Sequence, residues 1–126
     1  MADLTGSWLG TYWQSNEPTR FEATLAQARG SLSGRILDDG PLGEASLQGE
    51  VIGRQLTFIK RYLNNSNYSI RYTGTVSEDG NHISGQWFQN TRNSGSWEAQ
   101  RNPNGLAKAL KSFLEKRTPA TMTPTN

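Results

Sequence analysis

The chain alternates apolar and polar residues with a period of two, and Gly, Asn and Asp interrupt the alternation at short intervals. This pattern is typical of half-buried β-strands that are joined by turns. Because nearly all connections are too short for a crossover helix, each strand is expected to turn back antiparallel beside its predecessor. The pattern predicts eight strands, over residues 5–14, 19–28, 31–38, 45–52, 55–62, 68–77, 82–89 and 95–101.

Closure of this meander would remove the two unpaired edges that an open sheet leaves. An even number of strands brings the last strand back beside the first. The predicted fold is therefore all-β, an eight-stranded antiparallel up-and-down barrel over residues 1–101. The chain of 126 residues has the length of one domain.

Glycine recurs on the inward side of five predicted strands, at Gly10, Gly34, Gly49, Gly74 and Gly85. A missing side chain lets a strand coil sharply and leaves room for facing aromatic rings. We therefore interpret these glycines as steric, since no helix follows them to bind a phosphate.

Composition and charge exclude several functions. The chain has no Cys and one His, His82, which excludes disulfides, thiolate zinc sites and a histidine metal cluster, so no metal or cofactor is expected. Residues 1–101 carry nine basic and ten acidic side chains, too few positive charges for a nucleic-acid partner. No apolar run approaches the ~20 residues of a membrane span, and the first residues lack a secretory segment. These features predict a cytoplasmic protein without membrane association.

Loop length distinguishes the two ends of the predicted barrel. Tight connections at residues 29–30, 53–54 and 79–80 lie at one end, which we call the floor. There the guanidinium of Arg101 is expected to stack on the indole of Trp8. Longer polar connections lie at the other end, which we call the mouth.

Polar and aromatic side chains of the inward set gather nearest the mouth, above an apolar floor. This arrangement is typical of a ligand pocket, in which a few polar groups orient a ligand and aromatic walls bury it. We predict non-enzymatic binding of a small hydrophobic or amphipathic ligand whose acidic or carbonyl group meets Lys60. The predicted ligand-binding residues are Tyr12, Gln14, Asp38, Lys60, Tyr62, Tyr68, Tyr72, Trp87 and Gln89.

Two alternatives stay open from the residues alone. The barrel could be an enzyme of the isomerase, cyclase or lyase type that uses Asp38 and Lys60 as catalytic groups. It could instead be filled by its own side chains, with Lys60 and Asp38 paired, and act as a protein-interaction module.

The C-terminal residues predict an amphipathic helix over 102–117, followed by a flexible tail over 118–126. Four apolar residues have helical spacing and three lysines lie elsewhere on the wheel. The helix is expected to dock on the barrel wall, and binding to a membrane or a partner is the alternative. Assembly into a homo-oligomer is also left open. The apolar positions are Leu106, Leu110, Phe113 and Leu114, and the lysines are Lys108, Lys111 and Lys116.

Several short motifs resemble a known family of barrels. The segment Gly6-Ser7-Trp8, with Arg101 on the last strand, resembles the calycin signature of lipocalins and fatty-acid-binding proteins. Over residues 5–97 the pattern is more similar to the avidin and streptavidin group, and this resemblance implies an eight-stranded barrel. The motifs that carry it are Thr5-Gly6-Ser7-Trp8, Leu32-Ser33-Gly34, Phe58-Ile59-Lys60, Tyr72-Thr73-Gly74 and Ile83-Ser84-Gly85-Gln86-Trp87.

The resemblance does not extend to the biotin site. Trp87 and Trp97 match the aromatic residues that surround biotin in avidins, but the polar contacts differ. Other residues occupy the positions at which avidins hold biotin, so the resemblance implies the fold without biotin binding. These residues are Gly10, Gln14, Ile59, Tyr68 and Ile70.

Overall fold

The computed structural model describes residues 3–41, 43–64, 68–90 and 93–102. All eight predicted strands are present, with ends within two residues of the predicted ones. The predicted helix and tail over 102–126 lie, apart from Asn102, outside the described residues. The strands are β1 (Gly6–Gln14), β2 (Glu17–Ala28), β3 (Ser31–Asp38), β4 (Glu44–Ile52), β5 (Gln55–Tyr62), β6 (Ser69–Val76), β7 (His82–Asn90) and β8 (Asn93–Arg101).

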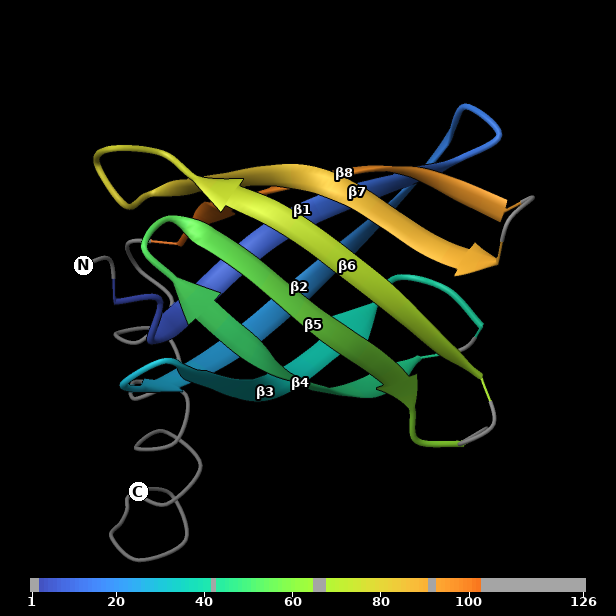
Figure 1. Cartoon of the computed structure of the whole chain (residues 1–126). Coiled ribbons are helices and arrows are strands. Elements are labelled where there is room, and N and C mark those ends of the chain that lie inside the picture. The colour runs from blue at the N-terminus through green and yellow to red at the C-terminus, as the bar shows by residue number, and fades with distance from the viewer. Residues whose placement is uncertain (1–2, 42, 65–67, 91–92, 103–126) are drawn as a thin grey trace, which may run out of the picture.

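The strands form a closed barrel in sequence order, and every neighbouring pair is antiparallel (Figure 1). Strand β1 pairs with β2 and also with β8, where Trp8 lies opposite Arg101 and Tyr12 opposite Trp97. The predicted all-β barrel is therefore confirmed. The β2–β3, β4–β5 and β6–β7 connections lie on the left of Figure 1, at the floor, and the other connections lie on the right, at the mouth. The predicted difference in loop length is only partly right, because the β1–β2 connection at the mouth is a two-residue turn at Ser15 and Asn16, both with positive φ, whereas the β6–β7 connection at the floor spans residues 77–81.

Alternation of buried and exposed side chains follows the predicted inward and outward faces. In β5, for example, Leu56, Phe58, Lys60 and Tyr62 are buried, and the residues between them are exposed. Deep in the barrel, the cavity bounded by core residues has a volume of only about 20 Å³. The part of the core that these described residues bound thus holds little free space.

Two inward glycines are required by close approach of neighbouring backbones. A Cβ atom at Gly49 would collide with the carbonyl oxygen of Thr57, and one at Gly85 with that of Thr73. Backbone atoms cannot move aside without breaking the strand pairing, so these positions admit glycine alone. The steric interpretation of these two residues is confirmed.

The floor is closed as predicted. The Arg101 guanidinium carbon lies 4.6 Å from the centre of the Trp8 ring. The same guanidinium donates hydrogen bonds to the carbonyl oxygens of Asp3, Thr5 and Gly80, at 2.9 to 3.0 Å. Because these carbonyls belong to the N-terminal segment and to the β6–β7 turn, Arg101 ties three parts of the chain together.

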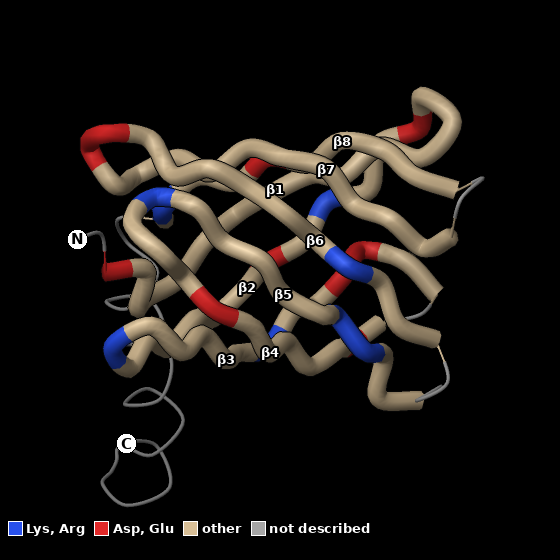
Figure 2. Tube along the Cα trace, in the orientation of Figure 1, with Lys and Arg blue, Asp and Glu red and all other residues tan. Residues whose placement is uncertain are grey.

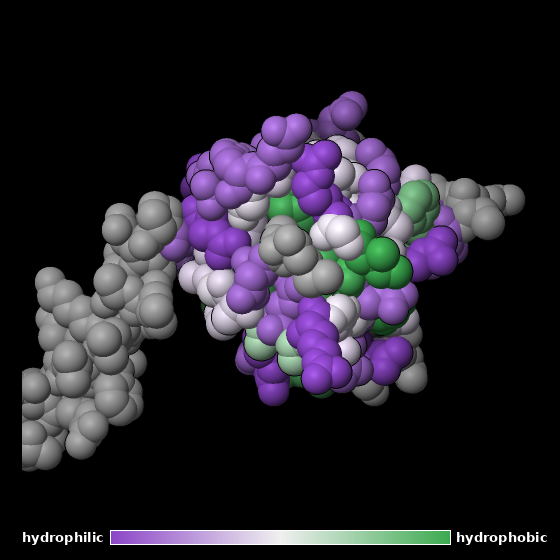
Figure 3. All heavy atoms as spheres, turned by 60° about the vertical axis from the view of Figure 1, so that its left-hand side comes forward, coloured by the Kyte–Doolittle hydropathy of each residue, from purple (hydrophilic) through white to green (hydrophobic). Residues whose placement is uncertain are grey.

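The outer surface carries mixed charge. Basic and acidic residues are interspersed along the barrel, and neither sign dominates a face in the view of Figure 2. Figure 3, in which the floor end is turned forward, shows mainly hydrophilic residues with a few hydrophobic ones between them. No helix among the described residues is long and apolar enough to cross a membrane. Exposed large apolar side chains are Leu37, Ile52, Ile59, Leu63 and Phe88.

Candidate functional site

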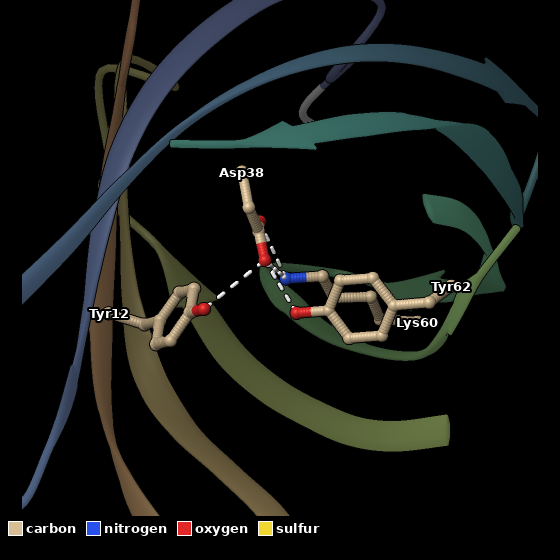
Figure 4. A network of polar contacts seen from close by, with 4 residues as sticks. All are labelled: Tyr12, Asp38, Lys60 and Tyr62. Atoms are coloured by element: carbon tan, nitrogen blue, oxygen red, sulfur yellow. Dashed lines mark hydrogen bonds and ion pairs between the residues drawn. The ribbon is translucent and has the colours of Figure 1, made fainter. Parts of the chain in front are cut away.

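Four of the predicted residues form one polar network, centred on the carboxylate of Asp38 (Figure 4). The Lys60 ammonium donates to Oδ1 at 2.8 Å and to Oδ2 at 2.9 Å. The hydroxyl of Tyr62 donates to Oδ2 at 2.5 Å, and that of Tyr12 donates to the same oxygen at 3.2 Å. The carboxylate therefore accepts hydrogen bonds from three side chains.

Strand geometry explains why these side chains meet. Asp38 is the last residue of β3, and its backbone N–H donates to the carbonyl oxygen of Gly43, which fixes the start of the β3–β4 loop. Lys60 and Tyr62 are two residues apart on β5 and so face the same side. Tyr12 reaches the carboxylate from β1, which Figure 4 shows on the far side of the network from Tyr62.

The Lys60 ammonium lies inside a group of aromatic rings. Its nitrogen is 4.8 Å from the ring centres of Tyr12 and Tyr62 and 5.7 Å from that of Tyr72. Lys60 is fully buried, and this burial lowers the pKa of its ammonium, while the charge of Asp38 acts in the opposite direction. The ion pair and the faces of the rings together compensate for the lost hydration of the charge.

Burial also affects the hydroxyl groups of the three tyrosines whose rings surround the Lys60 ammonium. Removal from water raises the pKa values of Tyr12, Tyr62 and Tyr72, and the negative charge of Asp38 raises them further. In the unfolded chain these hydroxyls ionise near pH 10. A raised pKa in the folded state stabilises the protein below pH 10, and this contribution is lost as the pH rises above 10.

A pH titration tests this effect. We expect the 295 nm absorbance of the folded protein to show no ionisation of these three tyrosines near pH 10, and we expect the free energy of unfolding to fall above that pH. The protein in denaturant serves as the reference, because all four tyrosines then titrate normally. Ionisation of all four near pH 10 with the fold retained would contradict the buried network.

Three further predicted residues pack around the network. Tyr68 is half-buried, and its ring lies edge-on to Tyr62, with the centres 5.4 Å apart. Tyr72 is 2% exposed and stacks on Phe58, with the ring centres 4.8 Å apart. Trp87 is buried, and its indole nitrogen donates to the carbonyl oxygen of Trp13 at 3.0 Å.

The two predicted glutamines lie apart from the network. Gln14 is exposed at the end of β1. Gln89 is half-buried near the end of β7, where its side-chain oxygen accepts a hydrogen bond from the amide of Asn93. Neither residue has a contact with Asp38 among those that the described part of the chain records.

The hydroxyl of Tyr72 differs from those of Tyr12 and Tyr62 in its hydrogen bonding. Tyr12 and Tyr62 both donate to Asp38, whereas the hydroxyl of Tyr72 has no hydrogen-bond partner among the described residues. A buried hydroxyl without a partner loses its hydration without compensation. The ring centre of Tyr72 lies 5.7 Å from the Lys60 ammonium nitrogen, so this tyrosine lies beside the network.

One feature of the predicted pocket is different in the structure. We expected the Lys60 ammonium to meet the acidic or carbonyl group of a ligand, but this ammonium is already paired with Asp38. The charges of the two side chains cancel, so the layer presents hydroxyl groups and aromatic rings rather than a free cation. Among the described residues, no group of three or more His, Cys, Asp and Glu side chains could hold a metal ion.

Sequence reasoning missed a groove on the outer wall of the barrel, which we call the wall groove. It has a volume of about 790 Å³ and extends over the outer faces of β7, β8, β1, β2 and β3. Its polar residues alternate with buried ones like those of any solvated strand face, so the alternation does not indicate a groove, although the predicted docking of the C-terminal helix on the barrel wall requires a surface of this kind. Its outward-facing residues are Leu9, Thr11, Arg20, Glu22, Leu37, Asp39, His82, Ser84, Glu98 and Gln100.

Comparisons with known proteins support the fold. Neither a protein-family model nor a curated protein sequence matches the chain. A solved structure described as a de novo designed fluorescence-activating β-barrel is 16% identical, with a TM-score of 0.61. The similarity covers 81% of this chain and 100% of the designed chain. It shows a common barrel fold, and the relation to calycins and avidins stays a prediction.

Proposed function

We propose that this protein binds a small amphipathic molecule at the mouth end of its barrel and does not transform it. The observation that carries this proposal is the hydroxyl of Tyr72, which is buried beside the Asp38 network and lacks a hydrogen-bond partner among the described residues. A ligand with an acceptor atom would supply the missing partner.

The cost of the network supports a site rather than packing alone. Burial of an ion pair stabilises a fold poorly, because desolvation of both charges offsets their attraction. In many proteins, apolar residues of similar volume replace a buried ion pair with little loss of stability. Asp38 and Lys60 are nevertheless both buried, and they lie toward the mouth, opposite the floor that Arg101 closes.

The Asp38–Lys60 pair and the tyrosine rings around it also limit the chemistry of the ligand. Because the charges of Asp38 and Lys60 cancel, a neutral polar group such as a carbonyl fits better than a carboxylate. The half-buried rings of Tyr12 and Tyr68 offer flat apolar contact to a planar body. Since the core below holds little free space, the ligand would reach into the barrel no further than the hydroxyl of Tyr72.

The designed β-barrel that this chain resembles is described as fluorescence-activating. At 16% identity the likeness concerns the fold alone, and one fold supports many functions. It supports the proposal only in that a β-barrel of similar fold is described as designed for fluorescence activation.

Binding is tested with a panel of planar amphiphiles that carry a carbonyl group. A ligand is expected to raise the melting temperature and to quench tryptophan fluorescence. Quenching is expected because the ring centres of Trp87 and Tyr12 are 6.4 Å apart. The variant Tyr72→Phe is expected to weaken binding by roughly three- to tenfold, the value of one hydrogen bond. It should not destabilise the free protein, because the hydroxyl has no hydrogen-bond partner in the part of the chain that the structure describes.

The variant His82→Ala is the matched control, since His82 is exposed on the outer wall and its loss should leave affinity unchanged. Unchanged affinity in Tyr72→Phe, or a panel that yields neither quenching nor stabilisation, would remove the proposal. An enzyme would return a changed ligand, and Asp38→Asn would then abolish turnover before it abolished binding.

A further inference from the structure

The wall groove has a regular arrangement of outward residues. The strand register aligns His82, Gln100, Leu9, Glu22 and Leu37 across five neighbouring strands, from β7 to β3. Because adjacent strands are ~4.8 Å apart, the two leucines of this row are about 10 Å apart. The side chain of Leu37 is 53% exposed, so the row presents an apolar side chain without cover from the described residues.

We propose that residues 106–114 of the same chain dock in the wall groove as an amphipathic helix. In a helix, Leu106 and Phe113 lie on one face and are separated by seven residues, about 10.5 Å. This spacing equals the distance between Leu9 and Leu37. A helix that crosses the strands along the row would place one apolar side chain over each leucine.

Charge supports the same occupant. The wall groove has the base Arg20 and three outward acids, Glu22, Asp39 and Glu98, and so a net charge of −2 with His82 neutral. Residues 102–126 carry four basic side chains and one acidic one, a net charge of +3. Opposite charge at close range favours association and sets its orientation.

The described chain also ends beside the groove. Gln100 lines it, and the backbone N–H of Asn102 donates to the carbonyl oxygen of Ser7 at the floor end of β1. The three residues 103–105 span at most about 10 Å. Residue 106 therefore starts within reach of Leu9, and a helix of nine residues, ~14 Å long, extends from there toward Leu37.

A spin label tests this contact in the full-length protein. The chain has no Cys, so Ser112→Cys gives a unique attachment point, on the side of the helix away from the apolar stripe. We expect the nitroxide to broaden the amide NMR signals of Leu9, Glu22 and Leu37 several-fold. The signals of Gln48 and Ile59, on β4 and β5 outside the groove, should stay sharp.

Variants in the tail make the test specific. Phe113→Asp should abolish the broadening, and Thr123→Asp, which adds the same charge beyond the helix, should preserve it. To detect contacts between molecules, spin-labelled protein without ¹⁵N is also mixed with ¹⁵N-labelled protein that carries no spin label. Broadening that is absent, that lies on another wall, or that appears only between molecules would overturn the proposal.

Discussion

Replacement of Trp8 by alanine is expected to lower the free energy of unfolding by about 3–5 kcal/mol, the usual cost of removing a buried tryptophan. Trp8 is 1% exposed, and its indole nitrogen donates to the carbonyl oxygen of Leu4 at 2.9 Å. Removal of the ring would leave a cavity beneath the Arg101 guanidinium and free Leu4, which is fully buried. Urea denaturation measures the loss.

A double-mutant cycle isolates the contact between Trp8 and Arg101. The single variant Arg101→Ala should cost less, about 1–2 kcal/mol, because its hydrogen bonds run to partly exposed backbone carbonyls. The double variant should lose less than the sum of the two, because each change removes the same contact. Arg54→Ala, at the exposed β4–β5 turn, is the control. Additive costs would show that the two side chains do not act together.

The second large effect is expected at Lys60. Lys60→Met should destabilise the protein by about 3–5 kcal/mol, because it leaves Asp38 buried without its countercharge. The double variant Asp38→Leu/Lys60→Met removes both charges and should recover much of this loss. Equilibrium unfolding at neutral pH measures all three proteins.

The control for Lys60→Met is Arg61→Met on the same strand, since Arg61 is exposed and should change stability by less than about 0.5 kcal/mol. Equal effects of the two changes would contradict the role of the buried pair. A double variant less stable than Lys60→Met would show that the Asp38 carboxylate stabilises the barrel through the tyrosine hydroxyls as well.

The candidate site was only partly predictable. Inward parity and proximity to the predicted mouth were enough to name Asp38, Lys60, Tyr12 and Tyr62 among nine residues. Parity assigns a side chain to a face, but strand tilt and stagger determine which rim residues share a layer. For this reason Gln14 and Gln89, with the same parity, lie away from the network that the other four form.

The sequence by itself determined the eight strands, their antiparallel order and the contact of Trp8 with Arg101. These features depend on alternation, turn residues and strand number, which are local or additive properties of the chain. Only the tertiary structure decided that Lys60 pairs with Asp38, that the Tyr72 hydroxyl has no partner among the described residues, and that the outer wall holds a groove. These features depend on distances between side chains of strands far apart in the sequence, and those distances are fixed only when the barrel closes.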